Sequence, residues 1–113
     1  MPMIVCNNIQ LHYMVSGSGP DVLLLHGNSS NLHFFDALTE KLEKRYTVYR
    51  MDSRCHGKSE KTKAIDYNMM MEDTAAFIQT LRLSRPALIG SSDGGITGLL
   101  LTHRYPDLLS CHI

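Results

Sequence analysis

This sequence of 113 residues has no tryptophan, only three cysteines and no excess of charge of either sign. Eleven basic residues balance eleven acidic ones, so the composition gives no reason to expect a nucleic acid partner. Cys6, Cys55 and Cys111 are odd in number and widely spaced, which argues against a disulfide framework or a zinc site and for a reducing compartment. We therefore expect a cytoplasmic protein.

Long apolar runs are also missing. No window approaches the roughly 18 apolar residues that a membrane span needs, and residues 1–8 lack the basic and apolar regions of a secretory signal. An apolar content of 43% is nevertheless enough to bury a core. We expect a soluble globular chain of one small domain at most, with no membrane as a partner.

Short apolar runs alternate with helical patterns along the chain. Asn7-Asn8 suits a tight turn between two β-prone runs, which predicts an opening hairpin. Further strands are predicted over residues 22–25, 46–51 and 86–90, and helices after Asn31 and over residues 69–81 and 96–104. The first helix is expected to bury one stripe, formed by Phe34, Phe35, Leu38 and Leu42. This alternation predicts an α/β fold with a doubly wound sheet.

The most informative stretch, residues 90–94, reads Gly-Ser-Ser-Asp-Gly and fits the pattern G-x-S-x-G with Ser92 at its centre. After a strand and before a helix, that pattern describes a nucleophile elbow, a strained turn that exposes one serine hydroxyl. Gly90 and Gly94 would leave room for the turn and the neighbouring strand. Short patterns of Gly and Ser also mark ordinary turns, which is the structural alternative. Ser91, outside the central position, is assigned to packing.

Two other stretches follow predicted strands in the same way. Residues 26–30 begin with His-Gly-Asn, and residues 52–59 read Asp-Ser-Arg-Cys-His-Gly-Lys-Ser. Together, LLLHG, DSRCHGKS and IGSSDGG resemble the α/β-hydrolase superfamily over nearly the whole chain, from Ile9 to Pro106. The resemblance implies a mostly parallel sheet with flanking helices and a triad of serine, acid and histidine.

The resemblance also implies roles for residues around the elbow. The backbone N–H groups of Asn28 and Asp93 would form the oxyanion hole, and the positive end of the helix that follows Ser92 would favour developing negative charge. His26 is expected to fasten its loop rather than to move protons. Asp52, Arg54 and His56 are expected to brace one another beside the site.

A general base and its acid are harder to find. The acids after Ser92 are Asp93 and Asp107, and the histidines are His103 and His112. At about 1.5 Å per residue, the intervening helix carries His103 and Asp107 far from the elbow. We therefore expect residues 1–113 to be the N-terminal portion of a single α/β-hydrolase domain, truncated after the elbow helix, with the base, the acid and a lid absent.

Two nucleotide-binding patterns fail on spacing. Residues 57–59 read Gly-Lys-Ser, but the first glycine of a phosphate loop would have to stand where Asp52 does. Ser92 likewise occupies the second glycine position of G-x-G-x-x-G. We expect no cofactor and no metal.

The sequence thus predicts a serine hydrolase that cleaves a carboxylic ester, a thioester or a related acyl or C–C bond of a small molecule, with Ser92 as nucleophile. By resemblance, dehalogenases and epoxide hydrolases would have an aspartate there. The alternative is a non-catalytic binding or assembly module with the same fold. Self-association is expected through the edge of the strand at 86–90, because truncation would leave that edge unpaired.

Overall fold

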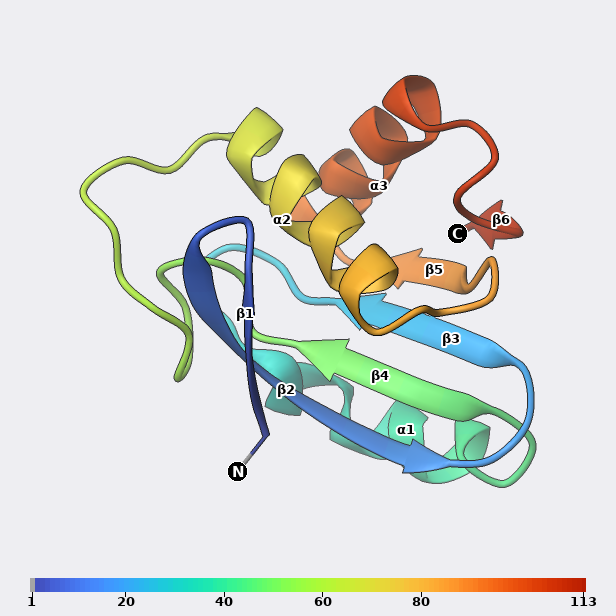
Figure 1. Ribbon diagram of the computed structural model, residues 1–113. Helices are drawn as coiled ribbons and strands as arrows, with labels where there is room; N and C mark the ends of the chain where they lie inside the picture. The colour runs from blue at the N-terminus through green and yellow to red at the C-terminus, as the bar shows by residue number, and fades with distance from the viewer. Residues whose placement is uncertain (1) are drawn as a thin grey trace.

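The computed structural model describes residues 2–113, in which six strands form one mixed sheet of order β1-β2-β4-β3-β5-β6 (Figure 1). The strands are β1 (Met3–Cys6), β2 (Ile9–Gly17), β3 (Asp21–Leu25), β4 (Thr47–Met51), β5 (Ala87–Gly90) and β6 (Cys111–His112). The helices are η1 (Leu32–Phe35), α1 (Asp36–Leu42), α2 (Tyr67–Thr80) and α3 (Asp93–Arg104). Helix α1 lies on one face of the sheet, and α2 and α3 lie together on the other. The predicted α/β fold is confirmed.

The chain opens with the predicted hairpin. Strands β1 and β2 pair antiparallel from Cys6 opposite Ile9 outward. The two residues between them, Asn7 and Asn8, have φ angles of 50° and 64°. A two-residue turn with both φ angles positive matches the twist of the flanking strands, and asparagine tolerates that conformation well. The hairpin therefore follows directly from the Asn-Asn pair.

Strand β3 is the centre of the sheet and pairs parallel with both β4 and β5. Its side chains alternate between two cores. Leu23 and Leu25 pack among the apolar residues of α2 and α3, whereas Val22 and Leu24 pack on the side of α1. A parallel strand covered on both faces must be apolar throughout, which explains the run of residues 22–25.

The first helix begins where it was predicted, but its buried stripe differs. Asn31 caps η1, and its side chain accepts a hydrogen bond from the N–H of His33 at 2.9 Å. The expectation that Phe34 is buried was wrong, since its side chain is 61% exposed. The first turn is a 3₁₀ turn, which rotates the residues relative to an α-helical stripe and leaves Phe35 to face the sheet.

Helices α2 and α3 begin earlier than their apolar patterns. The carboxylate of Asp66 accepts a hydrogen bond from the N–H of Met69 at 2.7 Å, so α2 starts at Tyr67 rather than at residue 69. Helix α3 starts at Asp93, three residues before the predicted start, because the elbow leads straight into it. Within residues 2–113, no helix has the length and apolar character required to cross a membrane.

The last residues correct one expectation about the sheet edge. Strand β6 pairs parallel with β5, with Cys111 opposite Ala87 and His112 opposite Leu88. Two backbone hydrogen bonds continue this pairing at Ile113. The premise that residues 86–90 form an unpaired edge was therefore wrong, because the chain turns back after α3 and reaches β5 before it ends.

Candidate active site

The three motif stretches begin at the same level of the sheet. Leu25, the last residue of β3, is the register partner of Met51, the last residue of β4, and of Gly90, the last residue of β5. Because the three strands are parallel, the loops after them leave the sheet at one edge. Residues 26–30, residues 52–59 and the elbow are thereby gathered where ligands bind in open α/β sheets.

Ser92 stands at the turn between β5 and α3 with φ 53° and ψ −112°. This conformation is costly for any residue with a Cβ and is kept only where the surroundings over-determine it. The side chain of Ser92 is exposed, whereas Ser91 is half-buried and its N–H donates to the carbonyl of Leu25 at 3.0 Å. The turn therefore presents Ser92 outward and ties Ser91 to β3.

Glycines make this turn sterically possible. A Cβ on Gly90 would lie 2.5 Å from the carbonyl of Gly94, and a Cβ on Gly94 would lie 2.2 Å from the backbone oxygen of Leu25. Gly27, in the loop after β3, comes so near the elbow that a Cβ there would be 3.1 Å from Cβ and 3.8 Å from Oγ of Ser92. The two glycines of the pentapeptide are needed for room, as predicted, and the 26–30 loop lies directly beside the serine.

Asn28 and Asp93 flank the serine from the two loops. Asn28 follows Gly27 on the exposed loop, and Asp93 is the first residue of α3. Both line one pocket of about 350 Å³ together with His56, Ile65, Asp66, Tyr67 and Met70. No hydrogen bond to a backbone carbonyl within residues 2–113 is made by the N–H of Asn28 or Asp93. The structure thus brings Asn28 and Asp93 together at one pocket, and each of them is next to a residue of the elbow turn or of the loop that packs on Ser92.

His26 fixes the loop that contains Asn28. The N–H of Ser53 donates to its Nε2 at 3.0 Å, so the ring proton is on Nδ1, which donates to the carbonyl of Gly27 at 2.7 Å. Burial lowers the pKa of His26 below its ordinary value, outweighing the opposite effect of the Gly27 carbonyl. A neutral imidazole is required by both hydrogen bonds, and neither nitrogen is free to accept a proton from Ser92.

Asp52, Arg54 and His56 do not form the single mutually braced group that was expected; each fastens a different segment. Asp52 receives hydrogen bonds from the N–H groups of Leu32 at 2.8 Å and Lys58 at 3.0 Å and contacts Nδ1 of His12 at 2.7 Å. The sequence could not show this, because these partners come from β2, η1 and the loop after β4.

Arg54 and His56 have their own partners. Arg54 makes two hydrogen bonds, of 2.9 and 2.8 Å, with the carboxylate of Asp73 on α2, and both side chains are buried. His56 contacts the carbonyl of Arg54 through Nδ1 at 2.9 Å, and its Nε2 accepts from the N–H of Ser29 at 3.2 Å. The only mutual contact of the group is therefore a backbone one. His56 lines the pocket, yet both of its nitrogens are used in holding loops.

The remaining histidines near the elbow helix do not reach Ser92 either. His112 packs its ring against Gly98, where a Cβ would meet Nε2 at 2.4 Å, and Gly98 lies six residues, or about 9 Å, along the helix from Ser92. His103 is exposed and about 16 Å along the same helix. His12 and His33 contact Asp52 and Asp36 instead, so within residues 2–113 no histidine makes a hydrogen bond with Ser92.

Tyr67 is a site residue that sequence reasoning missed. Its hydroxyl donates to Oδ1 of Asp93 at 2.9 Å, and this contact raises the pKa of the tyrosine. The two residues are 26 positions apart and meet only because α2 and α3 begin at the same end of the sheet. The one local signal is Asp66, a helix cap that places the next residue in the first turn of α2.

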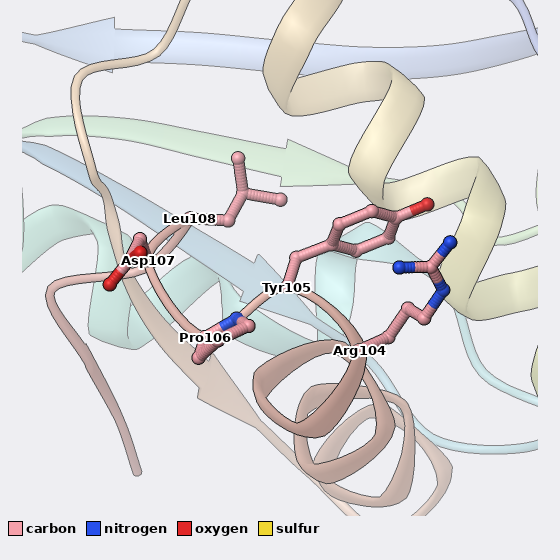
Figure 2. Close-up of a pocket in the computed structure, with 5 residues that line it drawn as sticks. All are labelled: Arg104, Tyr105, Pro106, Asp107 and Leu108. Carbon is pink, nitrogen blue, oxygen red and sulfur yellow. The ribbon is translucent and has the colours of Figure 1, made fainter.

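A second hollow of about 380 Å³ lies at the other end of α3 (Figure 2). It is lined by residues 104–108, and Figure 2 shows the guanidinium of Arg104 beside the ring of Tyr105, with Cζ 4.7 Å from the ring centroid. The hydroxyl of Tyr105 donates to Glu72 at 2.8 Å. The bond to Glu72 joins the end of α3 to α2. This hollow is formed by one short stretch of chain far along α3 from Ser92, so the pocket lined by Asn28 and Asp93 is the candidate site.

No group of three or more histidine, cysteine or acidic residues within residues 2–113 is arranged to hold a metal ion.

Comparison with known proteins agrees with this geometry. A family model described as alpha/beta hydrolase fold matches residues 20–113. The chain is 35% identical over 102 residues to 2-(acetamidomethylene)succinate hydrolase of Mesorhizobium japonicum, covering 89% of this chain and 37% of that protein. It is 32% identical over 111 residues to a fluoroacetate dehalogenase of a Burkholderia species, covering 93% of this chain and 36% of that protein.

Among solved structures, the enol-lactonase of Burkholderia xenovorans LB400 matches with a TM-score of 0.94 and 28% identity, over 98% of this chain and 45% of that one. The chain therefore spans less than half the length of each of these three proteins.

Proposed function

The chain belongs to the alpha/beta hydrolase fold family, and on that premise we propose that it is part of a serine hydrolase in which Ser92 is the nucleophile. The substrate class is a small molecule with a carboxylic ester, a thioester or a related acyl or C–C bond. Support comes from relatives that are hydrolases and from a pocket lined by Asn28 and by Asp93, the residue that follows Ser92.

The observation that carries the proposal is the conformation of Ser92. A residue with φ 53° and ψ −112° is strained, and here the strain is maintained by two glycines packed against backbone and by the pairing of Ser91 with Leu25. An ordinary turn would not need this strain, because a serine with common φ and ψ angles could form it equally well. An exposed hydroxyl held in this way at the end of a parallel strand is the arrangement of a nucleophile elbow.

The reaction follows from the groups around the hydroxyl. Oγ of Ser92 attacks the carbonyl carbon of the substrate, and the carbonyl oxygen becomes an oxyanion that accepts hydrogen bonds from the N–H groups of Asn28 and Asp93. Loss of one such donor typically costs about 10² to 10³ in kcat. The leaving group departs, and water then hydrolyses the acyl-serine ester. The N-terminus of α3 offsets about half of the negative charge of Asp93 in its first turn, so the oxyanion depends mainly on the two N–H donors.

The proton of Ser92 needs an acceptor that the neighbouring loops do not supply. His26 and His56 use both ring nitrogens in loop contacts. We propose that the histidine and its acid belong to a part of a longer protein that residues 1–113 do not include. Relatives of which the chain spans 37% or less have the length to supply such residues.

Serine chemistry separates this proposal from dehalogenation. Displacement of a halide by a serine hydroxyl would leave an alkyl ether on the protein, which water does not readily hydrolyse. Attack on a carbonyl leaves an ester, which a water activated by the same base can cleave. Similarity to a fluoroacetate dehalogenase therefore supports the fold and hydrolytic chemistry rather than that reaction.

A second candidate is a non-catalytic binding or assembly module with the same fold. The engagement of both nitrogens of His26 and His56 favours it, because residues 2–113 then hold no base for Ser92. Such a module would keep the pocket but would not activate the serine hydroxyl.

A fluorophosphonate probe separates the two candidates. We expect covalent labelling of Ser92 in the full-length protein, complete loss of labelling and of ester hydrolysis in Ser92→Ala, and retention of both in the matched control Ser91→Ala. Mass spectrometry of the labelled peptide identifies the serine. Ester turnover that persists in Ser92→Ala would end the serine-hydrolase proposal.

Residues 1–113 expressed alone should hydrolyse activated esters feebly or not at all. Addition of a separately expressed C-terminal portion that carries the acid and the histidine should restore turnover that depends on Ser92. Robust turnover by residues 1–113, lost in His103→Ala or His112→Ala, would show that the base lies within this chain.

The cysteines support a proposal about the cellular compartment. Cys6, Cys55 and Cys111 are all unpaired, which suits a reducing compartment such as the cytoplasm.

A further inference from the structure

The pocket beside Ser92 is acidic. Two of its lining side chains are the carboxylates of Asp66 and Asp93, and no lysine or arginine of residues 2–113 lines it. His56, the one other titratable group apart from Tyr67, has both nitrogens in hydrogen bonds to backbone groups. The formal charge that residues 2–113 contribute to this pocket is therefore negative.

Helix dipoles reduce this charge but do not cancel it. Asp66 caps α2 and Asp93 opens α3, so both carboxylates lie at positive helix ends. Each end is equivalent to roughly half a positive charge, which leaves about one net negative charge of the two. A pocket built for an anionic acyl group would instead be expected to leave these helix ends without carboxylates.

Tyr67 adds a feature that favours cations in particular. It lines the pocket together with Asp66 and Asp93, and its hydroxyl donates to Oδ1 of Asp93. This bond keeps the Asp93 carboxylate at the pocket and fixes the tyrosine side chain, which is 41% exposed. An aromatic ring with neighbouring carboxylates attracts alkylammonium groups through both the ring quadrupole and charge.

Apolar surface completes the wall. Ile65 and Met70 line the same pocket, and Ile65 is 42% exposed. A quaternary ammonium group has methyl groups around its charge, so it gains from apolar contact and from the carboxylates at once. A small metal ion or a primary amine would use only the charge.

We propose that this pocket binds a cationic alkylammonium group of the substrate, so that the preferred substrates are esters or thioesters that carry a trimethylammonium-like group within a few bonds of the scissile carbonyl. The inference rests on the proposed function for its chemistry, because Ser92 must be the nucleophile that cleaves the bond. The binding preference itself does not depend on Ser92.

Two isosteric thioesters test the preference in the full-length protein. S-(2-trimethylammonioethyl) thioacetate and S-(3,3-dimethylbutyl) thioacetate differ by a nitrogen cation in place of a carbon. In each, the acetyl C–S bond breaks, an acetyl–Oγ bond forms on Ser92, and the released thiol takes the proton that Ser92 gives up. The rate of thiol release gives kcat/KM for each thioester. Dividing kcat/KM for the cationic substrate by kcat/KM for the neutral one removes effects that are common to both substrates.

The ratio should fall about fivefold in Asp66→Asn and about fivefold in Asp93→Asn, the size expected for an exposed charge pair. Asparagine keeps the helix cap at 66 and the acceptor for Tyr67 at 93, so the variants remove charge and little else. Asp107→Asn, an exposed acid at the far end of α3, is the control and should leave the ratio unchanged. Added salt should lower the ratio in the unsubstituted protein.

If neither thioester is cleaved, measurements of ligand binding test the inference instead. In the full-length Ser92→Ala variant, ligand-observed NMR should show that choline binds more tightly than 3,3-dimethylbutan-1-ol, and that Asp93→Asn or Tyr67→Leu removes most of the difference. Equal binding of the two alcohols would overturn the inference. A kcat/KM ratio unaffected by both carboxylate substitutions would overturn it too, while leaving Ser92-dependent hydrolysis, and so the proposed function, intact.

Discussion

At the scale of single residues, the candidate site depends on a few side chains whose conformations are fixed by backbone contacts. Ser92 is held in a strained conformation, His26 in one tautomer, and Ser91 in a hydrogen bond with β3. Strain of this kind costs of order 1–3 kcal/mol per residue and is kept where function needs the geometry. The site therefore lowers stability in exchange for placing a hydroxyl.

Replacement of Ser92 by glycine should make the protein more stable and inactive. Glycine adopts φ 53° and ψ −112° without strain, which offsets the entropy that glycine loses on folding and leaves a net gain of about 1 kcal/mol. Denaturant titration measures the change in the free energy of unfolding. The control Ser92→Ala keeps the Cβ and should show no comparable gain; equal stability of the glycine and alanine variants would contradict the account of strain.

His26 should make stability depend on pH. Its pKa in the folded state lies below the ordinary value of 6.5, because burial disfavours the charged ring. As the pH falls, the unfolded state therefore takes up the proton before the folded state does. The contribution of the neutral His26 to stability is fully present above pH 6.5 and is lost as the pH falls from 6.5 through the folded pKa.

The variant His26→Gln tests this dependence. Glutamine can still accept from the N–H of Ser53 but does not titrate, so the loss of stability just below pH 6.5 should be reduced. Denaturant midpoints measured across this range report the slope. His103→Gln, on the exposed surface of α3, is the matched control and should behave as the unsubstituted protein. An unchanged slope in His26→Gln would show that another group titrates.

At the scale of elements, the elbow depends on close packing between β3, β5 and the first residues of α3. Helix α3 approaches β3 so closely that only a hydrogen atom fits between Gly94 and the carbonyl of Leu25. One position further along the helix there is space. Gly94 and Gly95 are thus chemically identical neighbours with opposite steric surroundings.

We expect Gly94→Ala and Gly95→Ala to change stability in opposite directions. A Cβ at 94 would be 2.2 Å from the oxygen of Leu25, and relief of that overlap by moving backbone should cost about 3 kcal/mol. A Cβ at 95 meets nothing nearer than 3.5 Å, so its higher helix propensity should add up to about 1 kcal/mol. Thermal or denaturant unfolding measures both, and a tolerated Gly94→Ala would contradict the close packing.

At the scale of the whole molecule, the sheet continues to the last residues of the chain. Strand β6 covers β5, so the edge of the sheet is a strand of two residues rather than the elbow strand itself. Two apolar side chains on one face of α3, Ile96 and Leu99, are 40% and 64% exposed. A short edge strand limits pairing with another chain, whereas exposed apolar side chains promote association.

We still propose that residues 1–113 associate with themselves, now through this face of α3 rather than through the sheet edge. Sedimentation velocity should show a mean mass that rises with concentration. The double variant Ile96→Lys with Leu99→Glu should shift the chain toward monomer. Monomeric behaviour at all concentrations in the unsubstituted chain would count against the proposal.

The sequence alone determined the local chemistry of this protein. The Asn-Asn pair specified a hairpin because few residues accept two positive φ angles, the run at 22–25 specified a strand buried on both faces, and G-x-S-x-G specified a turn that only small residues permit. Each of these signals is carried by residues adjacent in the chain, where sterics act directly.

Tertiary structure decided which residues distant in the sequence come into contact. The alignment of Leu25 with Met51 and Gly90 depends on strand register, which no single stretch encodes. The partners of Asp52 come from three segments, the ring nitrogens of His56 are occupied by loop backbone, and Tyr67 reaches Asp93 only because α2 and α3 start at one end of the sheet. Such contacts join residues 20 to 40 positions apart in several cases, so they follow from packing and not from local pattern.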